Sequence, residues 1–287
     1  MKGKIVQPYT IVWTCIFSIV LGLAGELPAI AQDESSPWEK GALQFGGFVT
    51  FFNSDLRFGP VGARNSTIDA EDLLGLDTQM TVFRVDAMIR PGASRRNQID
   101  AGYAGYHRSG SATLDRNITI EGTTYPIGAK IDTTFNFDLI RATYSYAFLQ
   151  TDRVRLGLGL GLYGIPLKYD VKVQTLRGQS AAQGADTILP FPALAFRGEF
   201  QVLPKLFLRA SADGMYLPIS DFSGTLVDAN IGLEYRIWKY FGIGLGYNYT
   251  EAIVEGKASS SNYPGVDFVG EVDVHFSGLL FYGKLAF

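Results

Sequence analysis

The stretch Val154–Tyr163, which reads VRLGLGLGLY, alternates between large apolar side chains and a second set of one arginine, three glycines and one tyrosine. A period of two places the leucines on one face of a β-strand and the glycines on the other. Glycine at alternate positions would destabilise an α-helix by roughly 1 kcal/mol each, so a helix is excluded. The two faces require two different environments, one of them apolar.

The composition is that of a β-rich protein with few charges. The chain of 287 residues is long enough for one large β domain, and it contains Gly 33, Phe 20 and Tyr 15 with only 18% charged residues. A formal net charge of −3 gives no indication of a nucleic-acid partner. The single cysteine is Cys15, so the chain beyond it has no disulfide and no thiolate metal site.

Residues 1–31 are expected to be a secretory signal peptide. Lys2 and Lys4 precede an apolar core at Ile11–Leu23, and Ala29-Ile30-Ala31 is a small-x-small cleavage site. A single membrane anchor helix is the alternative, but the apolar run is shorter than the roughly 20 residues that span a bilayer. We therefore predict a signal peptide at 1–31, a periplasmic lead-in at 32–42 and a barrel at 43–287.

The alternating pattern recurs along the rest of the chain, with short and long connections in turn. Five long loops and four short turns separate ten strands, and eight strands are the alternative. The predicted strands are Leu43–Leu56, Thr78–Arg90, Gln98–Arg108, Ile131–Leu149, a fifth from Val154, Leu189–Val202, Leu206–Leu217, Thr225–Arg236, a ninth around Gly242–Tyr249, and a last one from Val266 to the end. This pattern predicts an all-β fold, a single antiparallel up-and-down transmembrane β-barrel with periplasmic short turns.

The direction of the apolar face separates a membrane barrel from a soluble lipocalin-like barrel, whose apolar face points inward. Several predicted strands reach the length of about 9–11 residues that crosses a bilayer at a tilt. Aromatic residues gather near both strand ends, as at the two bilayer interfaces. They are Tyr144, Tyr146, Phe148, Phe200, Tyr235, Trp238, Tyr240 and Phe281 near the short turns, and Tyr216, Tyr247 and Tyr249 nearer the long loops. We therefore expect the leucines to face lipid.

The end of the chain carries alternate apolar residues and a terminal phenylalanine, namely Leu279, Phe281, Leu285 and Phe287. This pattern resembles the assembly signal of bacterial outer-membrane proteins. With the signal peptide and the hairpin pattern, the chain resembles the small outer-membrane β-barrel proteins of the OmpA-barrel and OmpW-like type, although Gly283 stands where a bulkier residue is usual. The resemblance implies a Gram-negative outer membrane, contact with lipid and lipopolysaccharide, and insertion by the barrel-assembly machinery.

With the leucines outward, charged side chains of both signs face the interior. They are Arg84, Asp86, Arg90, Asp100, Arg141, Arg155, Arg197, Glu199, Arg209, Asp213, Asp228, Glu234, Arg236 and Lys284. They could line a selective pore, or form a network of paired charges that fills a narrow lumen. We favour the network, because unpaired charges there would be costly and the signs nearly balance. Glycines such as Gly159 and Gly244 are expected to leave room for arginines of neighbouring strands.

Two motifs suggest a hydrolase as an alternative to a non-enzymatic barrel. His275-Phe276-Ser277 has the His-x-Ser spacing of the lipid A deacylase barrels, whose histidine and serine face lipid, but no acidic residue follows it in this chain. Asp273-Val274-His275 resembles the Asp-x-His of the omptin proteases, although their aspartate pair has no convincing match near Asp69 and Asp72. His107 is expected to be a polar residue on the loop side. No cofactor or metal motif is present.

Overall fold

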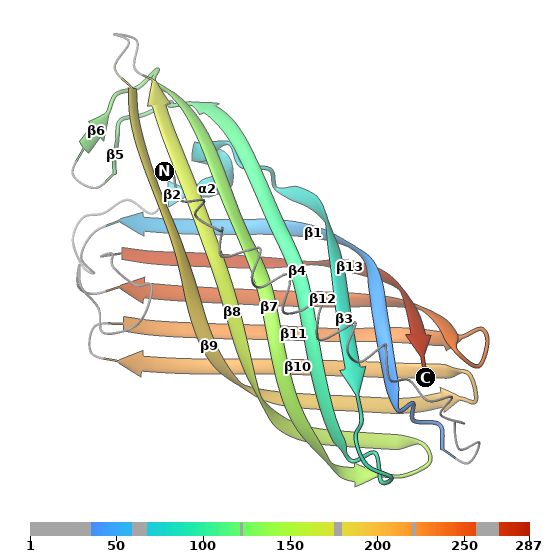
Figure 1. Ribbon diagram of the computed structural model, residues 1–287. Coiled ribbons are helices and arrows are strands. Elements are labelled where there is room, and N and C mark those ends of the chain that lie inside the picture. Colours follow the sequence, from blue (N-terminus) through green and yellow to red (C-terminus); the bar gives the residue numbers. More distant parts are fainter. Residues whose placement is uncertain (1–35, 59–67, 121–122, 175–179, 220–221, 257–269) are drawn as a thin grey trace, which may run out of the picture.

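The chain folds into a closed, all-antiparallel β-barrel of ten long strands (Figure 1). The computed structural model describes residues 36–58, 68–120, 123–174, 180–219, 222–256 and 270–287, so the predicted signal peptide lies outside the described residues. The long strands are β1 (Gly41–Phe58), β3 (Gln79–Ile89), β4 (Asn97–Thr113), β7 (Lys130–Gln150), β8 (Val154–Gln174), β9 (Ser180–Leu203), β10 (Leu206–Ile219), β11 (Phe222–Arg236), β12 (Phe241–Gly256) and β13 (Gly270–Ala286).

Each long strand pairs with the next long strand in the chain, and β13 pairs with β1 to close the sheet. The closing ladder runs from Ala42 opposite Ala286 to Phe58 opposite Gly270, so it extends along the whole of β1. The prediction of a ten-stranded antiparallel barrel is confirmed, and the eight-stranded alternative is wrong. The last strand ends beside the start of the first, at the end of the barrel that carries the short turns (Figure 1). We call this the short-turn end.

The outer and inner faces of the wall separate as the alternation in Val154–Tyr163 predicted. Leu158, Leu160 and Leu162 lie on the outer surface, with 59%, 67% and 56% of their area exposed. Arg155 points inward and is buried. This is the reverse of a soluble lipocalin-like barrel, which is therefore excluded.

The aromatic residues predicted to form two belts are all exposed on the outer surface. The group near the short turns includes Tyr146 and Trp238, and the group nearer the long loops includes Tyr216 and Tyr249. Between them the outward residues of β8, β9, β12 and β13 are largely aliphatic. An apolar band between two aromatic girdles is the surface that membrane barrels present to a bilayer.

Strands β8 and β9 are longer than predicted. The sixth strand was predicted to begin at Leu189, after a long loop, but β8 continues to Gln174 and β9 begins at Ser180, with these two residues paired. Strands that rise above the apolar band have no lipid to face, so the alternation that identifies a strand in the sequence is lost there. The ends of β7, β8 and β9 lie near a small hairpin of β5 (Ile118–Ile120) and β6 (Thr123–Tyr125) (Figure 1).

The interior at the long-loop end is an apolar core, which the sequence did not predict. Phe52, Tyr106, Phe137 and Phe276 pack with ring centroids 4.6–6.0 Å apart. Residues 57–77, the long loop between the first two predicted strands, were expected to be polar. The described part of this segment includes β2 (Ile68–Asp69) and a short helix, α2 (Ala70–Leu74). Leu73, Leu74 and Leu76 belong to the same apolar core. In the part of the chain that is described, no helix has the length and apolar character to span a membrane.

Helix α2 is held against the barrel wall by its own polar residues. Asp69 is its N-cap and accepts a hydrogen bond from the Asp72 backbone N–H at 2.8 Å. Arg108 of β4 contacts Glu71 of the helix and donates to the Ser54 hydroxyl of β1 at 3.1 Å. Asp69 therefore has a structural role at this helix, which closes over the apolar core, and Asp72 contributes its backbone N–H.

Candidate functional site

The predicted charged residues all lie in the interior, where they form a continuous network on the short-turn side of the apolar core. Two layers can be distinguished. The short-turn layer contains Glu39, Arg90, Gln98, Arg155, Glu199, Arg209, Glu234, Arg236 and Lys284. The central layer contains Arg84, Asp86, Asp100, Arg141, Asp213, Asp228, Arg197, Tyr163, Asn248 and Thr250.

Glu199 is the centre of one half of the short-turn layer. It contacts Arg90 and Arg209, and its Oε1 accepts a hydrogen bond from Nη1 of Arg155 at 3.1 Å. Gln98, which was not predicted, bridges two of these bases, because its Oε1 accepts from Arg90 Nε at 2.9 Å and from Arg155 Nη1 at 2.6 Å. These contacts join four strands, β4, β8, β9 and β10, with the residue that follows β3.

Glu39 is the centre of the other half, although it precedes the first strand and was assigned to a polar lead-in. Its carboxylate contacts Lys284, accepts from Arg209 Nη2 at 2.8 Å, and lies 3.4 Å from Arg236 Nη2 and 3.8 Å from Arg90 Nη1. The side chain has no exposed area. Burial alone would raise the pKa of Glu39, but these bases outweigh it and hold the pKa well below its ordinary value.

Trp38 anchors the same segment in the mouth of the barrel. It is 2% exposed, its indole N–H donates to the Thr151 carbonyl at 2.8 Å, and its ring packs edge-on against Phe207. Arg95 contacts the Trp38 carbonyl and Arg236 donates to the Pro37 carbonyl at 3.1 Å. The predicted boundary at 42/43 is therefore displaced: β1 begins at Gly41, and the residues before it enter the lumen. We call residues 36–39 the plug segment.

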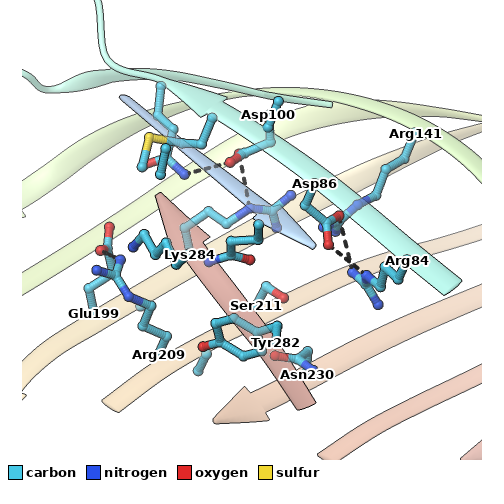
Figure 2. Close-up of a pocket in the computed structure, with 18 of the residues that line it drawn as sticks. Arg84, Asp86, Asp100, Arg141, Glu199, Arg209, Ser211, Asn230, Tyr282 and Lys284 are labelled. Carbon is cyan, nitrogen blue, oxygen red and sulfur yellow. Dashed lines mark hydrogen bonds and ion pairs between the residues drawn. The ribbon is translucent and has the colours of Figure 1, made fainter. Parts of the chain in front are cut away.

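The central layer pairs carboxylates with arginines from facing strands. Asp86 lies between Arg84 and Arg141, at 2.7 Å from Arg84 Nε and 2.6 Å from Arg141 Nη2 (Figure 2). Asp213 accepts from Arg197 Nη1 at 2.6 Å and from the Tyr163 hydroxyl at 2.5 Å. Such charge-assisted bonds between buried partners stabilise the arrangement only because every member has a partner.

The glycines give room to the network at positions other than those predicted. At Gly102 a Cβ would lie 2.5 Å from Arg141 Nε and from Asp86 Oδ1, so this glycine is required by the central layer. At Gly159 and Gly244 the prediction of space for arginines is wrong. A Cβ there would meet the Tyr144 carbonyl at 2.0 Å and the Tyr282 ring at 2.1 Å, so they admit a close backbone approach and a tyrosine.

A cavity of about 110 Å³ lies between the two layers (Figure 2). Its charged lining residues are Asp86, Asp100, Glu199, Arg84, Arg90, Arg141, Arg197, Arg209 and Lys284. At roughly 10–15 Å³ per water, this volume holds several waters. The cavity lies between the plug segment on one side and the aromatic core on the other.

Both histidines of the chain lie on the outer face of the wall, so the interior contains none. His275 and Asp273 share this face on β13, and the register places Glu251 of β12 opposite His275, while the Tyr249 hydroxyl donates to Glu251 at 2.9 Å. His107 of β4 lies 3.5 Å from Asp138. The acidic neighbour of His275 therefore comes from the preceding strand, β12, and not from the residues that follow it in the chain.

The C-terminal residues lie on the outer face as a row on β13. Leu279, Phe281 and Leu285 are exposed, and the Phe287 ring covers Gly41, where a Cβ would lie 2.3 Å from it. Gly283, which departs from the usual pattern, leaves room for the rings of Phe45 and Phe241, at 3.3 and 3.6 Å from the position of a Cβ.

Glu39, Gln98 and Asn248 are the main members of the network that the sequence prediction missed. Gln98 and Asn248 are inward by the same alternation, but they were left out because they carry no charge. Glu39 lies outside any alternating segment, so its direction was not predictable from periodicity. The one available signal was the excess of bases over acids in the predicted inward set, which indicates a missing buried carboxylate.

No protein-family model and no curated protein matches this chain. Among solved structures, the outer membrane protease OmpT from Escherichia coli has a TM-score of 0.53 at 10% identity, with 86% of this chain and 96% of that chain covered. The toluene transporter TodX from P. putida has a TM-score of 0.38 at 8% identity, covering 88% and 93%. The Ail protein of Yersinia pestis has a TM-score of 0.32 at 12% identity, covering 87% and 100%. The likeness to OmpT is one of fold, that of an outer-membrane β-barrel.

Proposed function

We propose that this protein is a structural, non-enzymatic β-barrel of a Gram-negative outer membrane, whose own side chains close the lumen to solutes. The apolar wall with two aromatic belts supports the membrane location, and the OmpT-like fold is consistent with it. In this proposal the short turns face the periplasm, the wall contacts lipid and lipopolysaccharide, and the row from Leu279 to Phe287 is read by the barrel-assembly machinery.

The observation that carries the closed lumen is the pairing of its charges across the barrel. Arg90 after β3, Arg209 of β10 and Lys284 of β13 reach shared carboxylates, and the plug segment and the apolar core lie on either side. A conducting pore requires a continuous aqueous path, whereas the cavity between the two layers has a volume of about 110 Å³, which holds several waters. In this proposal the charged residues have a structural role, which is to hold the strands of the barrel together.

The purified protein should give no steady current in planar lipid bilayers. The measurement is single-channel recording at neutral pH, with an open porin inserted under the same conditions as the positive control. Liposome swelling in small sugars gives an independent readout, and vesicles with this protein should swell no faster than empty vesicles. Large, steady unitary currents would contradict the closed lumen.

A second candidate, a hydrolase on the outer wall, is favoured by one observation: Glu251 lies opposite His275, with Ser277 two residues along the same face. A histidine beside an acid and a hydroxyl is the arrangement of a nucleophilic hydrolase. If this is the function, His275→Ala should abolish release of fatty acid from outer-membrane lipid, while His107→Ala should leave it unchanged. Absence of both fatty-acid release and peptide cleavage by the unaltered protein would exclude the candidate.

A further inference from the structure

The plug segment carries its carboxylate into a site that the barrel builds independently. Four bases converge on Glu39, and they come from around the barrel: Arg90 after β3, Arg209 of β10, Arg236 of β11 and Lys284 of β13. Most of them have other partners that hold them in place. Arg90 and Arg209 both contact Glu199, and Lys284 Nζ lies 3.1 Å from Glu234 Oε2.

The occupant of this site is not part of the barrel sheet. Glu39 precedes β1, and its neighbours on the plug segment are held by the Trp38 ring and by backbone carbonyls of Pro37 and Trp38. Removing the Glu39 side chain therefore leaves the ladder between β1 and β13 intact, but it leaves four bases around an empty volume and removes the carboxylate that draws the plug segment towards them. That volume fits a small carboxylate in shape, and its positively charged lining complements the negative charge of a carboxylate.

We propose that these four bases form a carboxylate-binding site at the short-turn mouth of the barrel, which the chain fills with its own Glu39 and which a free carboxylate occupies when that side chain is removed. Carboxylate is the class favoured because both oxygens of Glu39 are used, with Oε1 towards Arg209 and Lys284 and Oε2 towards Arg236 and Arg90. Bases that contact both oxygens in this way complement the two oxygens of a carboxylate.

The test is chemical rescue in a protein whose only tryptophan is Trp38. The chain has three tryptophans, so Trp13→Phe and Trp238→Phe leave Trp38 as the reporter of the plug segment. In this background Glu39→Gly should expose Trp38, with a red-shifted emission and a several-fold larger acrylamide quenching constant. Propionate has the atoms that this substitution removes, and it should restore the buried emission at neutral pH.

The controls distinguish specific binding of a carboxylate from effects of shape alone or of ionic strength alone. Propionamide has the same shape without the charge, and sodium chloride has the ionic strength without the shape, so neither should restore the emission. Glu39→Gln fills the volume with an amide and should not respond to propionate. Folding of each variant is verified by its heat-dependent gel mobility, and Glu39→Ala with acetate, which has the atoms that this smaller substitution removes, takes the place of Glu39→Gly with propionate if Glu39→Gly does not assemble.

Two outcomes would overturn the proposal. One is an unchanged Trp38 signal in both variants, which would show that Glu39 does not hold the plug segment. The other is rescue by chloride or propionamide as effective as rescue by propionate, which would show a site without preference for carboxylate. Since Trp38 fluorescence reports the plug segment whether or not the barrel conducts, this result and the bilayer recordings are independent.

Discussion

Leu160→Arg should lower the free energy of unfolding in lipid vesicles by about 2–4 kcal/mol. Leu160 is 67% exposed on the outer face of β8, in the middle of the leucine row that spans the apolar band. An arginine there must either enter the hydrocarbon or distort the bilayer around it. The measurement is denaturant unfolding in phosphatidylcholine vesicles, followed by tryptophan emission, with the change in the midpoint converted through the denaturant slope.

The matched control is Leu156→Arg on the same strand and the same face. Leu156 is the third residue of β8, close to the short turn, so its arginine reaches the headgroups and should cost only about 0–1 kcal/mol. Leu160→Ala separates the loss of apolar area from the addition of charge. Equal losses for both arginine variants would mean that no bilayer depth distinguishes the two positions, and the membrane orientation of this face would be wrong.

The barrel could be predicted from the sequence because a membrane wall imposes a period of two wherever lipid lies on one side. That constraint identified the outer face of β8 through the leucines of Val154–Tyr163, and the inner face followed by alternation. The same constraint ends at the edge of the apolar band. It therefore could not predict that β9 begins at Ser180, or that Leu73 of α2 packs into the lumen.

The charged interior was predictable by position but not by pairing. Alternation places Arg90, Glu199 and Arg209 inward, yet which base meets which acid depends on the closure of the barrel and on contacts between strands distant in the chain. Glu39 was not predictable because no periodic segment includes it. Its direction depends on Trp38 and on bases that the fold alone brings together.

Glu199→Ala should destabilise the protein by about 3–5 kcal/mol, because it leaves buried arginines without their shared carboxylate. Arg90 and Arg209 retain Glu39 as a partner, whereas Arg155 loses the one carboxylate it contacts among the described residues. The unfolding measurement in vesicles gives the loss directly. Asp152→Asn, in an exposed turn, is the matched control and should change the free energy by less than about 0.5 kcal/mol.

A second substitution can show whether the loss of stability comes from the unpaired charge of Arg155 or from lost packing. Adding Arg155→Met to Glu199→Ala removes the stranded charge and should recover part of the stability, so that the double variant is more stable than Glu199→Ala alone. In a lumen open to bulk water the arginines would remain solvated. Glu199→Ala would then cost little, and Arg155→Met would add a loss instead of a recovery. The sign of the second step therefore decides between a closed and an open interior by thermodynamics, without recording any current.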